Sequence, residues 1–328
     1  MSIRNNDLEV ISIASDWLQA GHSVQLVTVV RTWGSSPRPI GSLAAVRDDG
    51  ALVGSVSGGC VEKQLAEKVV AKHPNFQPAS PDVHTVVHRI NDEQAQRFGL
   101  ACGGELELVF EQLATPDALL ELASLLSQRI RICRTTNVQN GQSTVQSLSE
   151  ADVAEFSFDG EQLIKYFGPQ WRLLIVGAGQ LSRYCAEFAL TLDCDVIVCE
   201  PRPGFKEAWQ VEGTVLTDMS PDDAVLKFAT DSSSAVLALS HDPNVDDLAL
   251  LEALPSNAFY VGALGSRANH QRRCKRLQGL GLDERDTARL KGPVGLDIGS
   301  RTSAEIAISI LAEYIQQQRA QLQRPTKT

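Results

Sequence analysis

The segment from residue 171 to residue 200 constrains the fold more than any other part of the chain. A strand-like apolar run at 171–176 leads into Gly177-Ala178-Gly179, a helical pattern follows, and a second apolar run at 195–199 ends at Glu200. This order of strand, glycine turn, helix, strand and acid is typical of a dinucleotide-binding βαβ unit. In such a unit Gly177 makes the turn and Gly179 leaves space for a pyrophosphate at the helix N-terminus. Glu200 is then placed to bind the ribose hydroxyls.

Two residues depart from the usual motif of this unit. Ser182 stands where a third glycine is usual, which requires the helix and the strand to pack less closely. Arg202 follows the acid after one proline, where it is placed to receive a ribose phosphate or another anion.

Further apolar runs at 235–240 and 258–261 predict that the strands continue into a doubly wound parallel sheet. Ligands of such sheets lie beyond the carboxyl ends of the strands. The first run ends at His241, which is either a proton carrier or a turn histidine satisfied by Asp242. The second leads into Gly265-Ser266-Arg267, which we include among the candidate binding residues.

A second glycine-rich stretch, Gly54-Ser55-Val56-Ser57-Gly58-Gly59-Cys60-Val61-Glu62, lies in the N-terminal half. Val61, Leu65 and Val69 fall four apart and predict a helix that begins just after Cys60. Backbone N–H groups at a helix N-terminus favour the thiolate, which is the nucleophilic and metal-binding form of cysteine. Glu62 opposes this effect. The alternative is a small buried cysteine that merely starts a helix.

Two further segments are candidates for the same site. Residues 31–41 predict a loop in which Ser35, Ser36 and Arg38 hold an anion, because a guanidinium offers paired donors to phosphate or carboxylate. The alternative is a surface loop that its prolines only stiffen. Cys102 is also bordered by small residues and precedes a strand. The two cysteine loops therefore either converge on one ligand or are unrelated turns.

The chain of 328 residues is long enough for two domains. We predict an N-terminal α+β domain at 1–168, a C-terminal Rossmann-like domain with a doubly wound parallel sheet at 169–318, and a frayed tail at 319–328. Thr302 and Glu305 suit a capping box at the start of the last helix. In the first domain we expect helices at 7–20, 61–72 and 115–128, and strands at 24–30, 42–47, 51–56, 83–90, 106–110, 131–136, 143–148 and 163–167.

Composition narrows the class of partner and compartment. A formal net charge of −10 argues against nucleic acid, which is bound through clustered Lys and Arg. No apolar run reaches the roughly 18 residues of a membrane span, and the start lacks the apolar core of a signal peptide. We therefore expect a cytoplasmic protein with reduced thiols. The 7 cysteines include no CxxC pair, which disfavours a structural zinc site.

Taken together, the motifs resemble the XdhC/CoxI family of xanthine dehydrogenase accessory proteins. The matching segments follow family order and span most of the chain: residues 34–38, 54–62, 102–104, 177–179, 200–202, 262–267 and 295–299. Two positions differ from the family pattern. Glu200 stands where Asp is usual, and Gln180 stands where a histidine commonly follows the glycine turn.

The resemblance implies a chaperone that protects the molybdenum cofactor, supports its sulfuration by a cysteine desulfurase and inserts it into an apo-molybdoenzyme of the xanthine dehydrogenase or aldehyde oxidoreductase type. Cys60 would contact the molybdenum, since soft sulfur donors suit such metals, with Cys102 as a second sulfur. Arg38 and the backbone N–H groups of residues 57–59 would hold the phosphate. The Rossmann unit would hold the nucleotide of a dinucleotide form of molybdopterin, or a separate NAD(P).

Two other classes of function remain open. One is an NAD(P)-dependent oxidoreductase with Glu200 on the ribose and Cys60 or His241 in catalysis. The other is a redox-sensing module that works through Cys60 and Cys102. We favour the chaperone over an enzyme, because no second constellation of acid, base and substrate-orienting arginine is visible. The apolar strands and the long last helix also leave a homodimer open.

Overall fold

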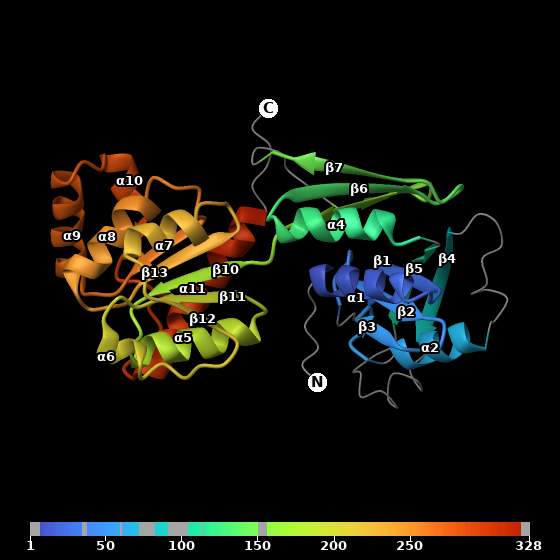
Figure 1. The fold of residues 1–328 in the computed structure, drawn as a ribbon, viewed down its shortest axis with the longest axis horizontal. Coiled ribbons are helices and arrows are strands. Elements are labelled where there is room, and N and C mark those ends of the chain that lie inside the picture. The colour runs from blue at the N-terminus through green and yellow to red at the C-terminus, as the bar shows by residue number, and fades with distance from the viewer. Residues whose placement is uncertain are drawn as a thin grey trace. The chain divides into compact units, whose positions relative to one another are not determined.

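The computed structural model describes residues 7–34, 38–59, 61–71, 83–90, 104–113, 115–149 and 156–322. The chain divides into two compact units, Met1–Pro169 and Gln170–Thr328, and each is described by itself (Figure 1). The predicted domain boundary lies one residue from this division.

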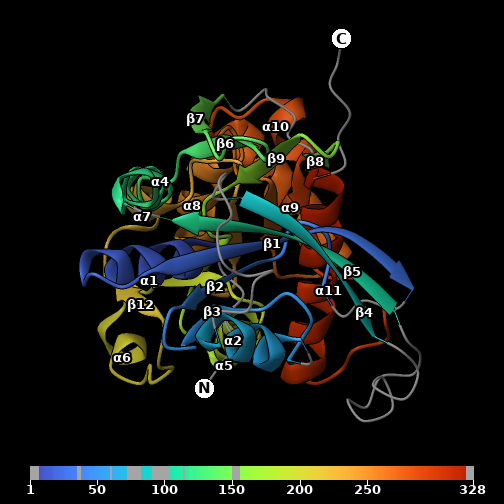
Figure 2. The ribbon, with the colours of Figure 1, turned by 90° about the vertical axis from the view of Figure 1, so that its right-hand side faces the viewer.

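The first unit contains two antiparallel sheets, one of five strands in the order β3-β2-β1-β5-β4 and one of four in the order β7-β6-β9-β8. Figure 2 shows β1, β5 and β4 side by side, with α2 below them. The elements are α1 (Asp7–Gln19), β1 (Val24–Gly34), β2 (Leu43–Arg47), β3 (Leu52–Gly54), α2 (Glu62–Val70), β4 (Val83–Ile90), β5 (Gly104–Leu113), α4 (Asp117–Ser127), β6 (Arg131–Asn137), β7 (Ser143–Leu148), β8 (Ser157–Phe158) and β9 (Gln162–Phe167).

Helices pack on both faces of the five-stranded sheet, because its strands alternate apolar side chains on each face. On one face α2 contributes Leu65 to a cluster that includes Leu108 and Phe110 of β5. On the other face α1 and α4 pack against β1 and β2 and against Ile132 and Phe167 of the second sheet. The helix that follows Cys60 is therefore anchored in a packed core.

The prediction of a loop over residues 31–41 is wrong for its first four residues, which continue β1. They pair with the start of β5, with Arg31 opposite Glu107 and Gly34 opposite Gly104, after a register shift between Val29 and Arg31. Partners about 70 residues away along the chain supply these hydrogen bonds, so the local abundance of glycine and proline did not reveal them.

The second unit is a six-stranded parallel sheet in the order β12-β11-β10-β13-β14-β15. This 3-2-1-4-5-6 order is that of the Rossmann fold, so the predicted doubly wound sheet is confirmed. The elements are β10 (Arg172–Val176), α5 (Gln180–Thr191), β11 (Asp195–Cys199), α6 (Pro203–Lys206), β12 (Val215–Thr217), α7 (Pro221–Phe228), β13 (Ser234–Ala238), α8 (Pro243–Ala253), β14 (Tyr260–Ala263), α9 (Arg267–Gly279), α10 (Glu284–Ala288), β15 (Leu290–Lys291) and α11 (Ser303–Leu322).

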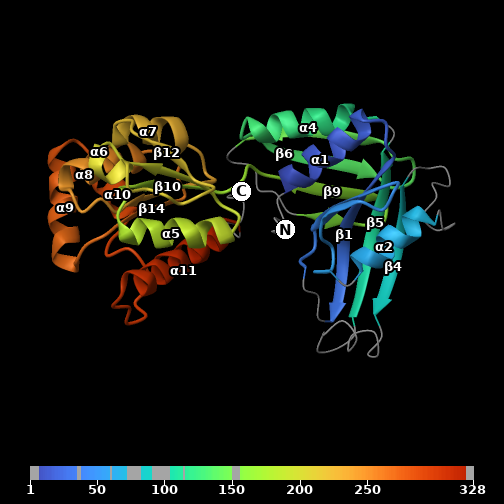
Figure 3. The ribbon, with the colours of Figure 1, turned by 60° about the horizontal axis from the view of Figure 1, so that its bottom comes forward.

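Two separate cores cover the two faces of this sheet. The first joins α5 and α11 to one face, and the second joins α7, α8 and α9 to the other. Figure 3 shows α5 and α11 on one side of the strands and α7 on the opposite side. The sheet is thus buried on both faces, and its carboxyl edge is left to carry the loops.

The start of the last helix is as predicted. The Thr302 hydroxyl accepts from the Glu305 N–H, and the Glu305 carboxylate accepts from the Thr302 N–H, which together form the expected capping box. The helix then continues to Leu322, which lies within the segment 319–328 that we predicted to fray. Gln, Arg, Ala and Leu are good helix formers and sustain the helix beyond its apolar stripe. Residues 323–328 lie outside the described part.

Within the described part of the chain, no helix combines the length and the apolar content needed to cross a bilayer.

The first unit also contains a buried ion pair between its two sheets. Glu111 of β5 and Arg134 of β6 are 2 % and 5 % exposed, lie 2.8 Å apart, and Thr136 donates to the same carboxylate. Breaking such a pair leaves one buried charge without a counter-charge.

We predict that Glu111→Ala lowers the free energy of unfolding of this unit by about 3–5 kcal/mol. Urea unfolding followed by tryptophan fluorescence measures the loss. The control is the double variant E111M/R134M, which removes both charges and should recover most of the stability. A single variant that unfolds at the wild-type urea concentration would contradict the prediction.

Candidate functional site

The loop between β3 and α2 closes around the carboxylate of Glu62. Oε1 accepts from the Ser55 hydroxyl at 2.7 Å, the Val56 N–H at 2.9 Å and the Ser57 N–H at 2.8 Å. Oε2 accepts from the Ser57 hydroxyl and, at 2.9 Å, from the Gly59 N–H. Five donors from four residues therefore converge on one side chain, which is 8 % exposed.

The charge on Glu62 is stabilised by these donors. Burial alone would raise the pKa of the carboxyl, but the hydrogen bonds from Ser57, Ser55 and the loop backbone lower that pKa to about 2. The loop therefore carries its own anion at neutral pH.

Serine hydroxyls connect this carboxylate to the rest of the loop. The Ser55 hydroxyl accepts from Arg38 Nε at 3.3 Å and from the Gly58 N–H at 2.9 Å. The Ser57 hydroxyl accepts from the Val61 N–H at 2.8 Å. Gly58 and Gly59 have φ values of 81° and 119°, which only glycine adopts without strain, and these conformations turn the N–H groups inward.

The sequence predicted that the backbone N–H groups of residues 57–59 bind a phosphate, and the hydrogen bonds of the loop correct this prediction. All three donate within the loop, to Glu62 or to Ser55, so none is available to an external anion in this conformation. The sequence contained the signal, two serines and two glycines before a glutamate in the first turn of a helix. From the sequence alone, that glutamate was interpreted only as a charge that opposes the thiolate.

The structure brings Arg38 to the cysteine loop through its bond to Ser55. Four of the predicted site residues, Ser35, Ser36, Cys60 and Cys102, lie outside the described residues. Their chain neighbours are placed: Gly34, which precedes Ser35, pairs with Gly104, which follows Cys102 by two residues. Among the described residues, only this pair of strand ends bears on the predicted site residues Ser35, Ser36 and Cys102.

In the second unit the glycine turn after β10 lies against the end of β13. Gly177 has a φ of 100°, and a Cβ there would lie 2.5 Å from the Ser240 Cα. This position therefore requires glycine for the fold itself. Gly179 differs, because a Cβ there would meet no atom within 4 Å. The space beside Gly179 is open, as a residue that faces a pyrophosphate requires.

Ser182, the residue at the third motif position, is fully buried in α5, and its hydroxyl has no hydrogen-bond partner among the described atoms.

Glu200 does not present a vacant carboxylate for ribose hydroxyls, contrary to the expectation from the sequence. It is fully buried and accepts four hydrogen bonds, from the Ala178 N–H and from the N–H, Nε and Nη2 of Arg202. Four donors use the roughly four lone-pair sites of a carboxylate. Burial raises the pKa of Glu200, but Arg202 and Ala178 lower it further, so the pKa lies below its usual value.

Arg202 is held on its other side by an aromatic ring. Its guanidinium carbon lies 4.3 Å from the ring centroid of Phe205, which is half-exposed, in cation–π geometry. A ribose could reach Glu200 only if Arg202 moved away.

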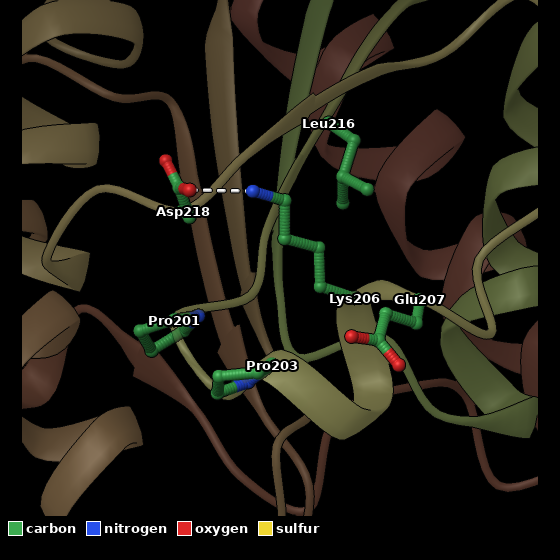
Figure 4. A pocket seen from close by; sticks show the side chains of 6 residues that line it. All are labelled: Pro201, Pro203, Lys206, Glu207, Leu216 and Asp218. Carbon is green, nitrogen blue, oxygen red and sulfur yellow. Dashed lines mark hydrogen bonds and ion pairs between the residues drawn. The ribbon is translucent and has the colours of Figure 1, made fainter.

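A hollow of about 370 Å³ adjoins this loop, between α6 and β12 (Figure 4). Its polar lining includes Lys206 and Asp218, which form an ion pair across it. The full lining is Pro201, Pro203, Lys206, Glu207, Leu216 and Asp218. Half of these lining residues are apolar and half are charged.

The remaining candidates lie at the carboxyl ends of β13 and β14. His241 is exposed with a φ of 63°, and the Asp242 carboxylate accepts from the Asn244 N–H as the cap of α8. Ser266 caps α9 by accepting from the Asn269 N–H, and Arg267 is exposed. These residues share the sheet edge with the glycine turn.

In the second unit, Cys185, Cys194 and Cys199 are buried thiols. Burial raises the pKa of Cys185 and of Cys199 to about 12, and that of Cys194 to about 11. They stay protonated at neutral pH and pack as small apolar residues. Among the described residues, no three His, Cys, Asp or Glu side chains gather as a metal site.

Comparison with known proteins identifies relatives along nearly the whole chain. A model of the XdhC Rossmann domain matches residues 173–314, and a model of the XdhC and CoxI family matches residues 17–73. The chain is 28 % identical over 311 residues to the molybdenum cofactor insertion chaperone PaoD of Escherichia coli (strain K12), covering 93 % of this chain and 86 % of PaoD. It is 24 % identical over 313 residues to a probable xanthine dehydrogenase subunit of Bacillus subtilis (strain 168), covering 89 % of this chain and 92 % of that protein.

One solved structure shares the fold over the full length. It is described as a xanthine dehydrogenase from Bacillus halodurans and superposes with a TM-score of 0.73 at 23 % identity, covering 98 % of both chains.

The two glycines of the turn should respond differently to substitution. We predict that Gly177→Ala destabilises the second unit by more than about 1–3 kcal/mol. The strained backbone conformation alone costs that amount, and the clash of the new Cβ with Ser240 adds to it. Gly179→Ala should stay within about 1 kcal/mol of wild type, because the Cβ meets nothing. Thermal unfolding of both variants tests this difference, and equal losses would show that the space beside Gly179 is not open.

Proposed function

Because the chain belongs to the XdhC and CoxI family, we propose that it is a chaperone that binds the molybdenum cofactor, protects it and inserts it into an apo-molybdoenzyme of the xanthine dehydrogenase or aldehyde oxidoreductase type. The observation that carries the proposal is its similarity to PaoD, which extends over 93 % of the chain. In this proposal the chain also supports sulfuration of the cofactor by a cysteine desulfurase.

The chemistry of the first unit supports this cargo. The cofactor is anionic and contains a thiophilic metal and a phosphate. Cys60 follows the loop that Glu62 organises, and its thiolate would contact the molybdenum, with Cys102 as a second sulfur. The N–H groups of residues 57–59 already donate to Glu62 and Ser55. In this proposal the phosphate is therefore bound by Arg38, together with Ser35 and Ser36, which are close to it in the sequence.

The second unit would bind the nucleotide part of a dinucleotide form of the cofactor. The open space beside Gly179 suits a pyrophosphate at the N-terminus of α5. In this proposal the base lies at the hollow between α6 and β12, which is lined by Pro201 and Pro203 on either side of Arg202. Ser266 and Arg267, which follow β14, are the remaining residues that we propose to bind the nucleotide at this edge of the sheet.

An NAD(P)-dependent oxidoreductase is the weaker alternative. Recognition of NAD usually requires a carboxylate that accepts the ribose hydroxyls. The corresponding Glu200 carboxylate is already occupied by Arg202 and Ala178.

Co-expression of a candidate molybdoenzyme with this chain tests the proposal. We predict that the client enzyme contains less molybdenum cofactor when the chain is absent, and that Cys60→Ser has the same effect. In the purified chain, Cys60→Ser should lower retained molybdopterin by at least about tenfold, because loss of a metal-contacting group weakens binding by that order or more.

The matched control is Cys133→Ser, which alters a partly exposed cysteine in β6 of the same unit. It should retain molybdopterin as the wild type does. If the client is filled equally well without the chain, the chaperone function is wrong. If the client needs the chain but Cys60→Ser retains molybdopterin as the wild type does, the chaperone function is supported and the contact between the Cys60 thiolate and the molybdenum is wrong.

A further inference from the structure

We propose that Glu62 is the positioning residue of the cysteine loop: its carboxylate occupies the anion nest of residues 55–59 and so fixes the chain on both sides of Cys60 before any cargo binds. The inference rests on the proposed function for one point, the identity of the bound cargo as the molybdenum cofactor. The geometry that carries it lies wholly within the first unit.

The hydrogen bonds of Glu62 leave it no capacity to act as a ligand. Its two oxygens accept five hydrogen bonds, whereas a carboxylate offers about four lone-pair sites. A direct role toward the cargo is therefore excluded, and a structural role toward the loop remains.

The same network holds both chain neighbours of Cys60. On one side the Gly59 N–H donates to Glu62 Oε2. On the other side the Val61 N–H donates to the Ser57 hydroxyl, which itself donates to Glu62 Oε2. Gly59 and Val61 are thus both held by one network that is centred on the Glu62 carboxylate.

The network is tied to the hydrophobic core through the helix that carries Glu62. Val61 and Leu65 are buried in the cluster formed by β1, β2, β5 and α2, and Val56 of the loop belongs to the same cluster. The carboxylate therefore joins a glycine-rich loop to a rigid helix. Without it, the loop would have to be ordered when the cargo binds, and that entropy cost would weaken binding.

Glu62→Ala tests the inference, because acetate matches the atoms that the substitution removes. We predict that Glu62→Ala retains molybdopterin about tenfold less well than wild type, the penalty of ordering one or two backbone residues at the binding step. Added sodium acetate should fill the vacated nest and restore retention, whereas sodium chloride at the same ionic strength should not. The control is Glu67→Ala, the same change at an exposed position of α2, which should behave as wild type.

Glu62→Gln provides a second variant if the alanine variant fails to fold. The Gln oxygen can keep the three contacts of Oε1, but its amide NH₂ faces the Gly59 N–H, so the bond next to Cys60 is lost. Retention should fall, and acetate should not restore it, because the nest is already filled. Folding is checked by thermal unfolding against Glu67→Ala.

Alkylation of Cys60 by iodoacetamide gives a readout that does not depend on cargo. Peptide mass spectrometry should show that the rate of Cys60 alkylation in Glu62→Ala differs from the wild-type rate. Added acetate should return it to the wild-type value, and the rate of Cys133 alkylation should be the same in all samples. If wild type retains no cofactor, the proposed function fails and alkylation alone decides the inference. Folded Glu62 variants with wild-type retention and wild-type Cys60 reactivity would overturn it.

Discussion

The contact on which the cysteine loop depends is between a buried carboxylate and the backbone that precedes it. A glycine-rich loop has high conformational entropy, and five hydrogen bonds to Glu62 offset that cost in the folded chain. Because the acceptor belongs to the chain itself, the loop needs no bound phosphate to hold its shape. Arg38 adds a positive charge beside this internal anion through Ser55.

A related arrangement appears at the glycine turn of the second unit. Glu200 accepts from the Ala178 N–H inside the turn and from three donors of Arg202. In both units a carboxylate close to a glycine turn binds groups of its own chain. Each is strongly desolvated, and each keeps its charge because its hydrogen bonds outweigh the cost of burial. Acidic residues that resemble ligand-binding groups in the sequence act here first as parts of the scaffold.

The sequence predicted the Rossmann fold well, because strand, glycine turn and helix are local patterns. The strands 83–90 and 195–199 have the predicted bounds, and the capping box of Thr302 and Glu305 forms as expected. The extension of β1 to Gly34 was missed, because its partner strand begins at Gly104. Such long-range pairing leaves no local signal.

The candidate site was predicted less completely. Arg38 Nε donates to the Ser55 hydroxyl of the cysteine loop, but that these segments share a binding site stays a prediction. The destination of each N–H group was not predictable, because serine, glycine and glutamate permit several hydrogen-bond patterns at the same spacing. For the same reason, the pairing of Glu200 with Arg202 was not distinguished from two vacant ligand groups.

The ionisation of Glu62 is the most direct measure of whether this carboxylate organises the loop. Its ¹³Cδ resonance can be assigned by comparing the glutamate-labelled wild type with Glu62→Asp, and then followed while the pH is lowered from neutral. With a pKa of about 2, the resonance should stay at the charged position while exposed glutamates titrate. A Glu62 resonance that titrates together with the exposed glutamates would show that the five hydrogen bonds do not hold in solution, and would contradict the account.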